Sequence, residues 1–417
     1  MNPGRTILAT LFIASAVTRA QVIPEAEGPA LPVSGTLHYD LHYSQTAQFY
    51  RGSQGDAQSS VLSGDVAYMN ASQVRPFSLT YSGGDRWNIS GGSYGRGYFQ
   101  HLLVSQGVLR RNWSFNLSDD ASLMPQTPTT GFSGIPGVGS LPSEPAQPSQ
   151  QILTLNTRSI YNMVNSSFTR SLDHATSLGI DGSYSILRFP NGGGLESSQL
   201  QLSPQVTWRL NALNSIFCQY SYSRFRYPGY SIVTQNQSVS CGLQRIWNRR
   251  LKTSISAGPQ RVTSTSGAGV TPTTGLFLNA TAGYQARSAS ATLGYLQTAT
   301  GSGGALIAFG TRIHDVNAEL ARQFGRNMTL SASGAYMRTQ SLMQINIINL
   351  QLSGVTNGEF GGVSASRRLG RYINVNANYT ATRQSSNSAL QANAIRGLSQ
   401  VIGFGIGYSP REMHFRK

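Results

Sequence analysis

Apolar and polar residues alternate along many segments of about ten residues in this chain. Successive side chains of a β-strand point to opposite faces, so the pattern predicts strands with one apolar and one polar face. The apolar positions of six such segments are Leu37, Tyr39, Leu41 and Tyr43; Phe77, Leu79 and Tyr81; Leu178, Ile180 and Tyr184; Leu200, Leu202, Val206 and Trp208; Met328, Leu330, Ala332 and Tyr336; and Ile373, Val375, Ala377 and Tyr379. No stretch after the N-terminal segment approaches the roughly twenty apolar residues of a membrane helix. If the chain spans a membrane, it does so as a closed barrel, in which every strand edge is paired.

The N-terminal segment has the features of a secretory signal peptide. Arg5 gives a positive start, residues 7–17 form a short apolar core, and Ala20 ends the segment on a small side chain. We expect residues 1–20 to be a signal peptide that directs export, followed by a proline-rich periplasmic leader at 21–34. This leader is too short to be a plug domain, so we expect an open or loop-narrowed barrel.

The composition is that of a weakly charged, polar chain. Charged residues make up only 12% of it, about half of their usual share in a soluble domain, and 45 of the 417 residues are glycine. The formal net charge of +16 raises the question of nucleic-acid binding. The sequence has no basic helix and no recognisable nucleic-acid module, so we expect no nucleic-acid partner.

Short polar or basic segments that resemble one another separate the predicted strands. Five of them are residues 170–174, 209–212, 245–249, 322–326 and 367–371, and less regular ones lie near Gln73, Arg110 and Arg287. Each of the eight short turns joins two strands, and one further strand precedes the first pair and one follows the last. This gives about eighteen strands (roughly 16–18). We therefore expect an all-β fold, a transmembrane antiparallel up-and-down β-barrel over residues 35–409, with a C-terminal tail at 410–417.

A repeat of about forty residues also fits a soluble β-propeller. A propeller blade would divide that length into four short strands packed on both faces, whereas here two longer strands with one consistently polar face fill it. Short turns on one side and long Gly-, Ser- and Pro-rich loops on the other also favour the barrel.

Seven of the predicted strands that leave the short turns end on their apolar face in tyrosine. A tyrosine ring prefers the membrane interface, where its hydroxyl stays in water, so tyrosines at one height predict an aromatic girdle. The residues are Tyr43, Tyr81, Tyr184, Tyr222, Tyr295, Tyr336 and Tyr379.

Together with the final strand, in which Gln400, Ile402, Phe404, Ile406 and Tyr408 share one face, these features resemble porin-type outer-membrane proteins of Gram-negative envelopes. The resemblance implies residence in the cell outer membrane, contact with its lipid and insertion by the barrel-assembly machinery. Such proteins commonly end on an aromatic residue, whereas this chain continues beyond Tyr408 to Lys417.

The longest loop, about residues 118–151, is the third outward connection. In porins the third loop often folds into the lumen, and this resemblance implies that Asp119, Asp120 and Glu144 face basic residues of the inner wall there. The alternative is a solvated external loop, since loops of this length are either functional or disordered.

His38, Asp40 and His42 share one face of the first predicted strand. Neighbouring positions on one face are about 6 to 7 Å apart, too far for these residues alone to chelate one metal ion. We expect them to line a polar lumen and predict no metal site.

Cys218 and Cys241 lie on consecutive strands at similar distances from the connection around Pro228 and Gly229. Symmetric pairing places them opposite each other, and an oxidising envelope permits a disulfide. Whether the bond forms depends on the register of the two strands.

The function that follows is a porin-like channel for passive diffusion of small polar solutes, with a mostly neutral, hydrogen-bonding lumen. The alternative is a structural, adhesive or polysaccharide-associated barrel that binds ligands through its outer loops. His101, His174, His314 and His414 belong to no motif with a nucleophile, so we expect no enzyme and no cofactor.

Overall fold

The computed structural model of the protein describes residues 35–51, 56–70, 72, 74–90, 97–126, 157–190, 196–229, 232–266, 269–300, 311–342, 346–347, 350–351, 354–386, 397–411 and 413–414. The expected signal peptide (1–20), the periplasmic leader (21–34) and Glu144 lie outside these residues. No helix in the described part of the chain has the length and hydropathy of a membrane span.

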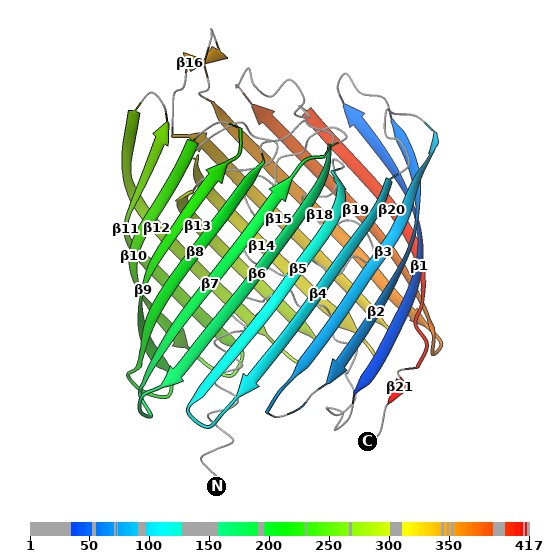
Figure 1. The fold of residues 1–417 in the computed structure, drawn as a ribbon. Coiled ribbons are helices and arrows are strands. Elements are labelled where there is room, and N and C mark those ends of the chain that lie inside the picture. Colours follow the sequence, from blue (N-terminus) through cyan, green and yellow to red (C-terminus); the bar gives the residue numbers. More distant parts are fainter. Residues whose placement is uncertain are drawn as a thin grey trace.

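Long antiparallel strands make up almost all of the described chain (Figure 1). They are β1 (Thr36–Arg51), β2 (Ala57–Asn70), β3 (Phe77–Ser90), β4 (Gly97–Leu109), β5 (Trp113–Gln126), β6 (Thr157–Ser171), β7 (Thr176–Arg188), β8 (Ser197–Arg209), β9 (Asn214–Tyr227), β10 (Ile232–Ile246), β11 (Leu251–Ser266), β12 (Gly269–Gln285), β13 (Ala289–Thr300), β14 (Thr311–Phe324), β15 (Met328–Ser341), β18 (Val355–Leu369), β19 (Ile373–Ser386) and β20 (Gly397–Tyr408). Three strands of two residues complete the set: β16 (Asn346–Ile347), β17 (Leu350–Gln351) and β21 (Met413–His414).

The long strands close into one barrel. Each pairs with the next in chain order, and β1 pairs with β20 from Leu41 opposite Tyr408 to Arg51 opposite Leu398. β16 and β17, which lie between β15 and β18 in the sequence, pair with each other in a separate small sheet. β15 therefore pairs with β18, the next long strand. The described residues thus form a closed barrel of eighteen antiparallel strands, which confirms the predicted fold and strand number.

The C-terminal residues add a short strand to the barrel. Met413 and His414 form β21, which pairs with Leu37 and Thr36 at the start of β1. Part of the expected tail therefore belongs to the sheet, and both ends of the barrel lie at the short-turn end (Figure 1).

Short connections separate the described strands where the sequence predicts the eight short turns, and in three of them an aspartate or asparagine side chain makes the same local contacts. Asp173, Asn211 and Asn248 each accept two backbone N–H groups, from the residues two and three positions later. This is the side-chain turn that aspartate and asparagine favour. Two other turns contain glycine with positive φ, Gly325 (64°) and Gly370 (73°), a conformation that costs glycine little.

The outward connections are less uniform than the sequence predicts. β9 and β10 are separated by residues 228–231 only, and β11 and β12 by residues 267–268 only. These two outward connections are short because the strands of each hairpin extend almost to the ends of the segment that joins them.

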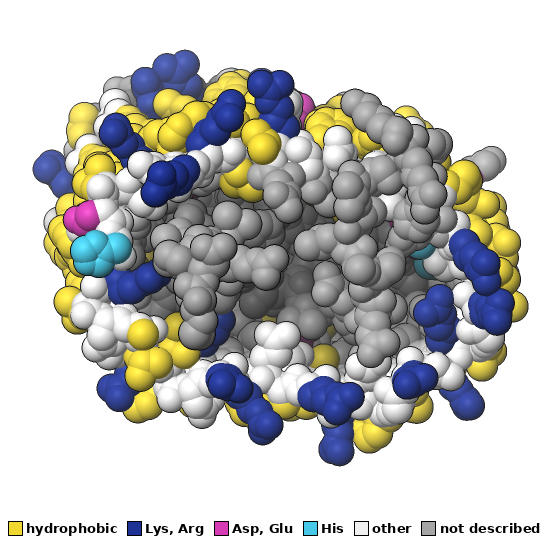
Figure 2. Space-filling view, turned by 90° about the horizontal axis from the view of Figure 1, so that it is seen from below, with side chains coloured by type: hydrophobic (Ala, Val, Ile, Leu, Met, Phe, Trp, Pro, Cys, Tyr) yellow, Lys and Arg dark blue, Asp and Glu magenta, His cyan; other side chains and the backbone are white. Residues whose placement is uncertain are grey.

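One face of each long strand points out of the barrel and carries most of its large apolar side chains, although Phe99, Phe225 and Ile313 are buried on the inner side. Leu41 is 53% exposed, Leu320 is 58% and Phe404 is 64%, although such residues would be buried in a soluble core. Figure 2, seen from the short-turn end, shows hydrophobic side chains around the outside and Lys and Arg side chains around the rim. An apolar outer band above a charged rim is the pattern of a lipid-facing barrel surface.

The seven predicted girdle tyrosines occupy outward positions, but their strands do not end there. β3 continues from Tyr81 to Ser90, and β9 continues from Tyr222 to Tyr227. Beyond Tyr222 the outward positions of β9 are Arg224 and Arg226. On β9 the tyrosine therefore lies where the outward positions change from apolar to charged, and the strand extends beyond it.

Candidate functional site

The inner wall of β1 and β2 combines histidine and aspartate side chains. His38 Nε2 lies 2.9 Å from Asp40 Oδ2, and His42 Nε2 lies 3.5 Å from Asp65 Oδ2 on the neighbouring strand. These side chains are 18–33% exposed, which leaves them partly accessible from the lumen. The structure places His38, Asp40 and His42 on the inner wall, as the alternation of the sequence indicated.

The cluster continues across β3 to β5. Asp40 is directly opposite Asp65, Asp65 is opposite Ser82 on β3, and Ser82 is opposite His101 on β4. Because these strands are adjacent and in register, four residues far apart in sequence form one row on the inner wall. The sequence contained no signal for this row beyond the two-residue period of each strand.

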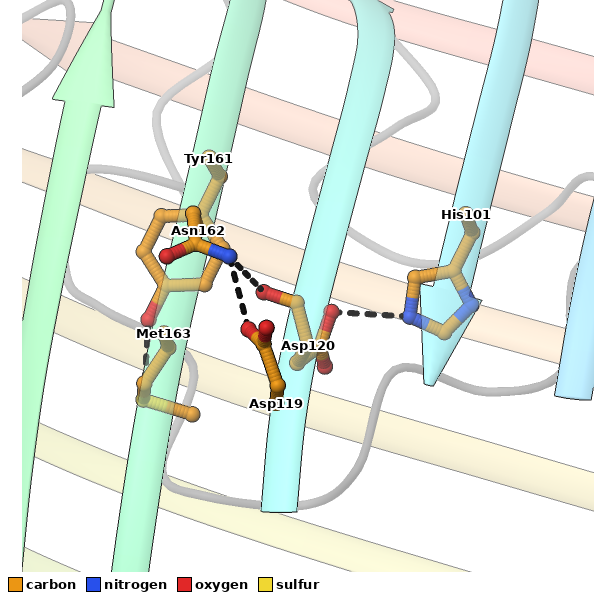
Figure 3. A network of polar contacts seen from close by, with 6 residues as sticks. All are labelled: His101, Asp119, Asp120, Tyr161, Asn162 and Met163. Atoms are coloured by element: carbon orange, nitrogen blue, oxygen red, sulfur yellow. Dashed lines mark hydrogen bonds and ion pairs between the residues drawn. The ribbon is translucent and has the colours of Figure 1, made fainter. Parts of the chain in front are cut away.

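His101 and Asp120 form a buried pair on the inner wall (Figure 3). His101 Nε2 lies 2.9 Å from Asp120 Oδ1, and the two side chains are 5% and 3% exposed. Burial of a carboxylate is costly unless it is paired and hydrogen-bonded, so each residue stabilises the other in this position. The sequence left the facing of His101 open, and the pairing depends on the β4–β5 register, in which Leu103 is opposite Asp120.

Asp119 and Asp120 do not belong to the third outward loop. Both lie within β5, which continues to Gln126, and β6 begins at Thr157, so the predicted loop start at about residue 118 is wrong. The described strands place the loop at residues 127–156 instead. The reason is that residues 118–126 still pair with β6 although they precede a segment rich in proline and glycine.

The two aspartates also face opposite sides of the wall. Asp119 is exposed on the outer face, where Asn162 Nδ2 donates a hydrogen bond of 2.7 Å to its Oδ1 (Figure 3). Asp120 faces inward with His101. Of these two residues, only Asp120 faces the inner side, and it does so from the barrel wall.

The inner face of β20 is almost bare. Gly403, Gly405 and Gly407 occupy successive inward positions, and a Cβ at any of them would meet a neighbouring side chain. At Gly407 the obstruction is the His42 ring, 2.6 Å away, and at the other two it is an asparagine side chain of β19. Glycine leaves room here for side chains of β1 and β19 to lie over the β20 backbone.

Cys218 and Cys241 are directly opposite each other on β9 and β10 and form a disulfide with a Cα–Cα distance of 4.1 Å. Both occupy outward positions, beside the exposed Val239 and Leu243. The bond therefore lies on the outer surface of the barrel and does not line the lumen.

Metal chelation finds no support in the described residues. They contain no group of three or more His, Cys, Asp or Glu side chains with the geometry to hold a metal ion. His38, His42 and His101 each lie within ion-pair distance of one carboxylate.

No protein-family model and no curated protein matches the sequence significantly. Solved structures to which this chain is similar include OccK9 (OpdG) of Pseudomonas aeruginosa, with 10% identity, a TM-score of 0.49 and coverage of 91% of this chain and 100% of that chain. A BenF-like porin from Pseudomonas fluorescens Pf-5 has 10% identity, a TM-score of 0.48 and coverage of 91% and 100%. The FrpB iron transporter from Neisseria meningitidis has 8% identity, a TM-score of 0.47 and coverage of 94% and 83%. Similarity this low does not assign a function, so the residues of the barrel must support one.

Proposed function

We propose that the protein is an outer-membrane channel through which small polar solutes diffuse passively. The observation that carries this proposal is the closed eighteen-strand barrel with an apolar outer face and a polar inner face. Barrels of about sixteen to eighteen strands enclose more space than wall side chains fill, which leaves an aqueous path.

The inner wall suits polar solutes because it offers hydrogen-bonding groups at most inward positions. β19 contributes Asn374, Asn376 and Asn378, and β8 contributes Gln199, Gln201 and Gln205. Such side chains replace part of the hydration shell of a solute that passes close to the wall.

The proposal includes export by residues 1–20 and insertion by the barrel-assembly machinery. The charged start and apolar core of the N-terminal segment support export. The outward Phe404, Ile406 and Tyr408 of β20 resemble the closing strand that the machinery recognises in other barrels. Fractionation of expressing cells tests this part, because protein that remains soluble in the periplasm would contradict it.

Conductance of purified protein in planar lipid bilayers tests the channel itself. We expect the current to increase in steps as protein molecules insert into the bilayer. Liposomes that contain the protein should also swell in a solution of an uncharged sugar, because the sugar enters them through the channel. The matched control is the same preparation after boiling. Protein that inserts without any conductance would overturn the proposal and favour a structural or adhesive barrel.

A further inference from the structure

Six carboxylates occupy inward positions on the barrel strands. Their facing follows from the register and from strand neighbours such as Leu41, Val66 and Ile180, which are exposed on the outside. The six residues are Asp40 on β1, Asp65 on β2, Asp120 on β5, Asp181 on β7, and Asp315 and Glu319 on β14.

These carboxylates lie on opposing parts of the wall. β1, β2, β5 and β7 belong to one side, whereas β14 is nine strands from β5 in either direction around the closed eighteen-strand barrel. A solute near the middle of the lumen therefore has negative charge on both sides.

The basic residues are distributed differently, although the chain has a net charge of +16. Most of those described lie in or beside the short turns, or at outward positions such as Arg224, Arg261 and Arg383. By register, the inward basic residues of the described strands are Arg86 on β3 and three residues beside the short turns: Arg209, Lys252 and Arg368.

Half of the inward carboxylates have histidine partners and half do not. Asp40, Asp65 and Asp120 contact His38, His42 and His101, respectively. For the other half, Asp181, Asp315 and Glu319, no basic side chain of the described residues lies within ion-pair distance. Asp315 accepts a hydrogen bond of 3.1 Å from Asn317 Nδ2, which is a neutral donor.

We infer that the channel prefers small cationic solutes, such as primary amines, over anionic ones. This inference rests on the proposed channel function. Carboxylates in a water-filled space with low-dielectric walls raise the local concentration of cations and lower that of anions. The arginines on the outer face add little to the field in the lumen, because water and salt screen charges beyond about 8 to 10 Å.

The first experiment measures the reversal potential of the channel in a KCl gradient at about pH 8, above the ordinary titration range of imidazole. We expect K⁺ to be about threefold to tenfold more permeant than Cl⁻. Liposome uptake of labelled putrescine and succinate, which have four-carbon chains of opposite charge, should show the same preference.

The decisive variant is the triple substitution Asp181→Asn, Asp315→Asn and Glu319→Gln. It removes the three carboxylates without ion-pair partners and changes little in side-chain volume. We expect the K⁺ to Cl⁻ permeability ratio to fall at least about twofold while conductance persists. The matched control, Asp119→Asn with Glu359→Gln, neutralises outward carboxylates and should leave the ratio unchanged.

The outcomes separate this inference from the proposed function. No conductance from the unmodified protein contradicts both. A channel with equal permeability to both ions, or one that favours Cl⁻, overturns the cation preference alone. A triple variant that conducts with an unchanged ratio also overturns it, provided that the variant shows the heat-dependent gel mobility of a folded barrel.

Discussion

Gln260 of β11 hydrogen-bonds both backbone groups of Ala299 on β13, the second strand along. Its Nε2 donates to the Ala299 carbonyl oxygen over 2.6 Å, and its Oε1 accepts from the Ala299 N–H over 2.7 Å. The backbone ladder between β12 and β13 stops at Leu278 opposite Gln297, so Ala299 has no partner on β12. Gly275, which is opposite Gln260 on β12, has no side chain to obstruct this contact. The amide of Gln260 thus takes the place of a missing strand neighbour.

Substitution of Gln260 by alanine should therefore destabilise the barrel more than loss of an exposed glutamine. It leaves the backbone N–H of Ala299 buried without its partner, at a cost of about 1 to 3 kcal/mol. It also leaves the Ala299 carbonyl oxygen with only the 3.5 Å contact from Thr298 Oγ1. The temperature at which the protein changes mobility on a detergent gel measures the effect. Gln237→Ala, at an exposed outward position of β10, is the matched control. Equal effects of the two substitutions would show that the Gln260 contact contributes nothing.

Asp120 should contribute to the stability of the barrel, because it pairs with the buried imidazole of His101 on the neighbouring strand. Asp120→Leu leaves His101 Nε2 without its partner and should cost about 1 to 3 kcal/mol. Asp120→Asn keeps an oxygen acceptor at nearly the same place, so its cost should be smaller. Urea unfolding of the protein in detergent micelles compares the two variants. A leucine variant as stable as the asparagine variant would contradict the argument.

Three predictions follow from the disulfide between Cys218 and Cys241. Mass spectrometry of the unreduced protein after alkylation should find neither thiol modified. Replacement of both cysteines by serine should lower stability by about 3 kcal/mol or less, the contribution expected for a loop of similar length. The effect on conductance should be absent, because the bond lies on the outer surface. Alkylated cysteines in the native protein would show that the bond does not form.

The turn at Asp173 should make a small, pH-dependent contribution to stability. Hydrogen bonds from the Ala175 and Thr176 N–H groups, 2.6 and 2.7 Å long, hold the pKa of the Asp173 carboxyl below its ordinary value. A carboxyl with a lower pKa in the folded state stabilises the protein above its unfolded pKa, about 3.9, and loses this effect as the pH falls through the folded value.

Asp173→Ala should therefore unfold at a lower temperature than the unmodified protein at about pH 7, and the difference should shrink at about pH 2.5. The gel-mobility transition measures both values. Asn211→Ala removes the same kind of turn without a titrating group, so its effect should not depend on pH. If both variants respond to pH in the same way, titration of Asp173 is not the cause.

Much of the barrel could be predicted because its signals are local. A hairpin turn involves only a few consecutive residues. In three turns the side chain of Asp173, Asn211 or Asn248 accepts hydrogen bonds from backbone N–H groups of the same turn. Alternation is a local signal of the same kind, because it shows which side chains of one strand share a face.

Strand ends were harder to place, because pairing with a neighbour decides where a strand stops. Asp119 and Asp120 precede a proline- and glycine-rich segment and were assigned to its loop, yet β6 pairs with β5 as far as Gln126. The tyrosine pattern predicts that the strand ends at Tyr81. β3 nevertheless continues beyond it, because β2 and β4 pair with it on either side.

The sequence by itself determined the class of fold, the number of strands and the face on which most residues lie. The reason is that the alternation of apolar and polar residues can be recognised within each strand, without its neighbours. Tertiary structure decided which side chains meet. The pair of His101 with Asp120, the row from Asp40 to His101 and the bond of Gln260 to Ala299 all depend on the register between strands. Register arises from the closure of the whole barrel, because each strand must match two neighbours at once and the last must match the first.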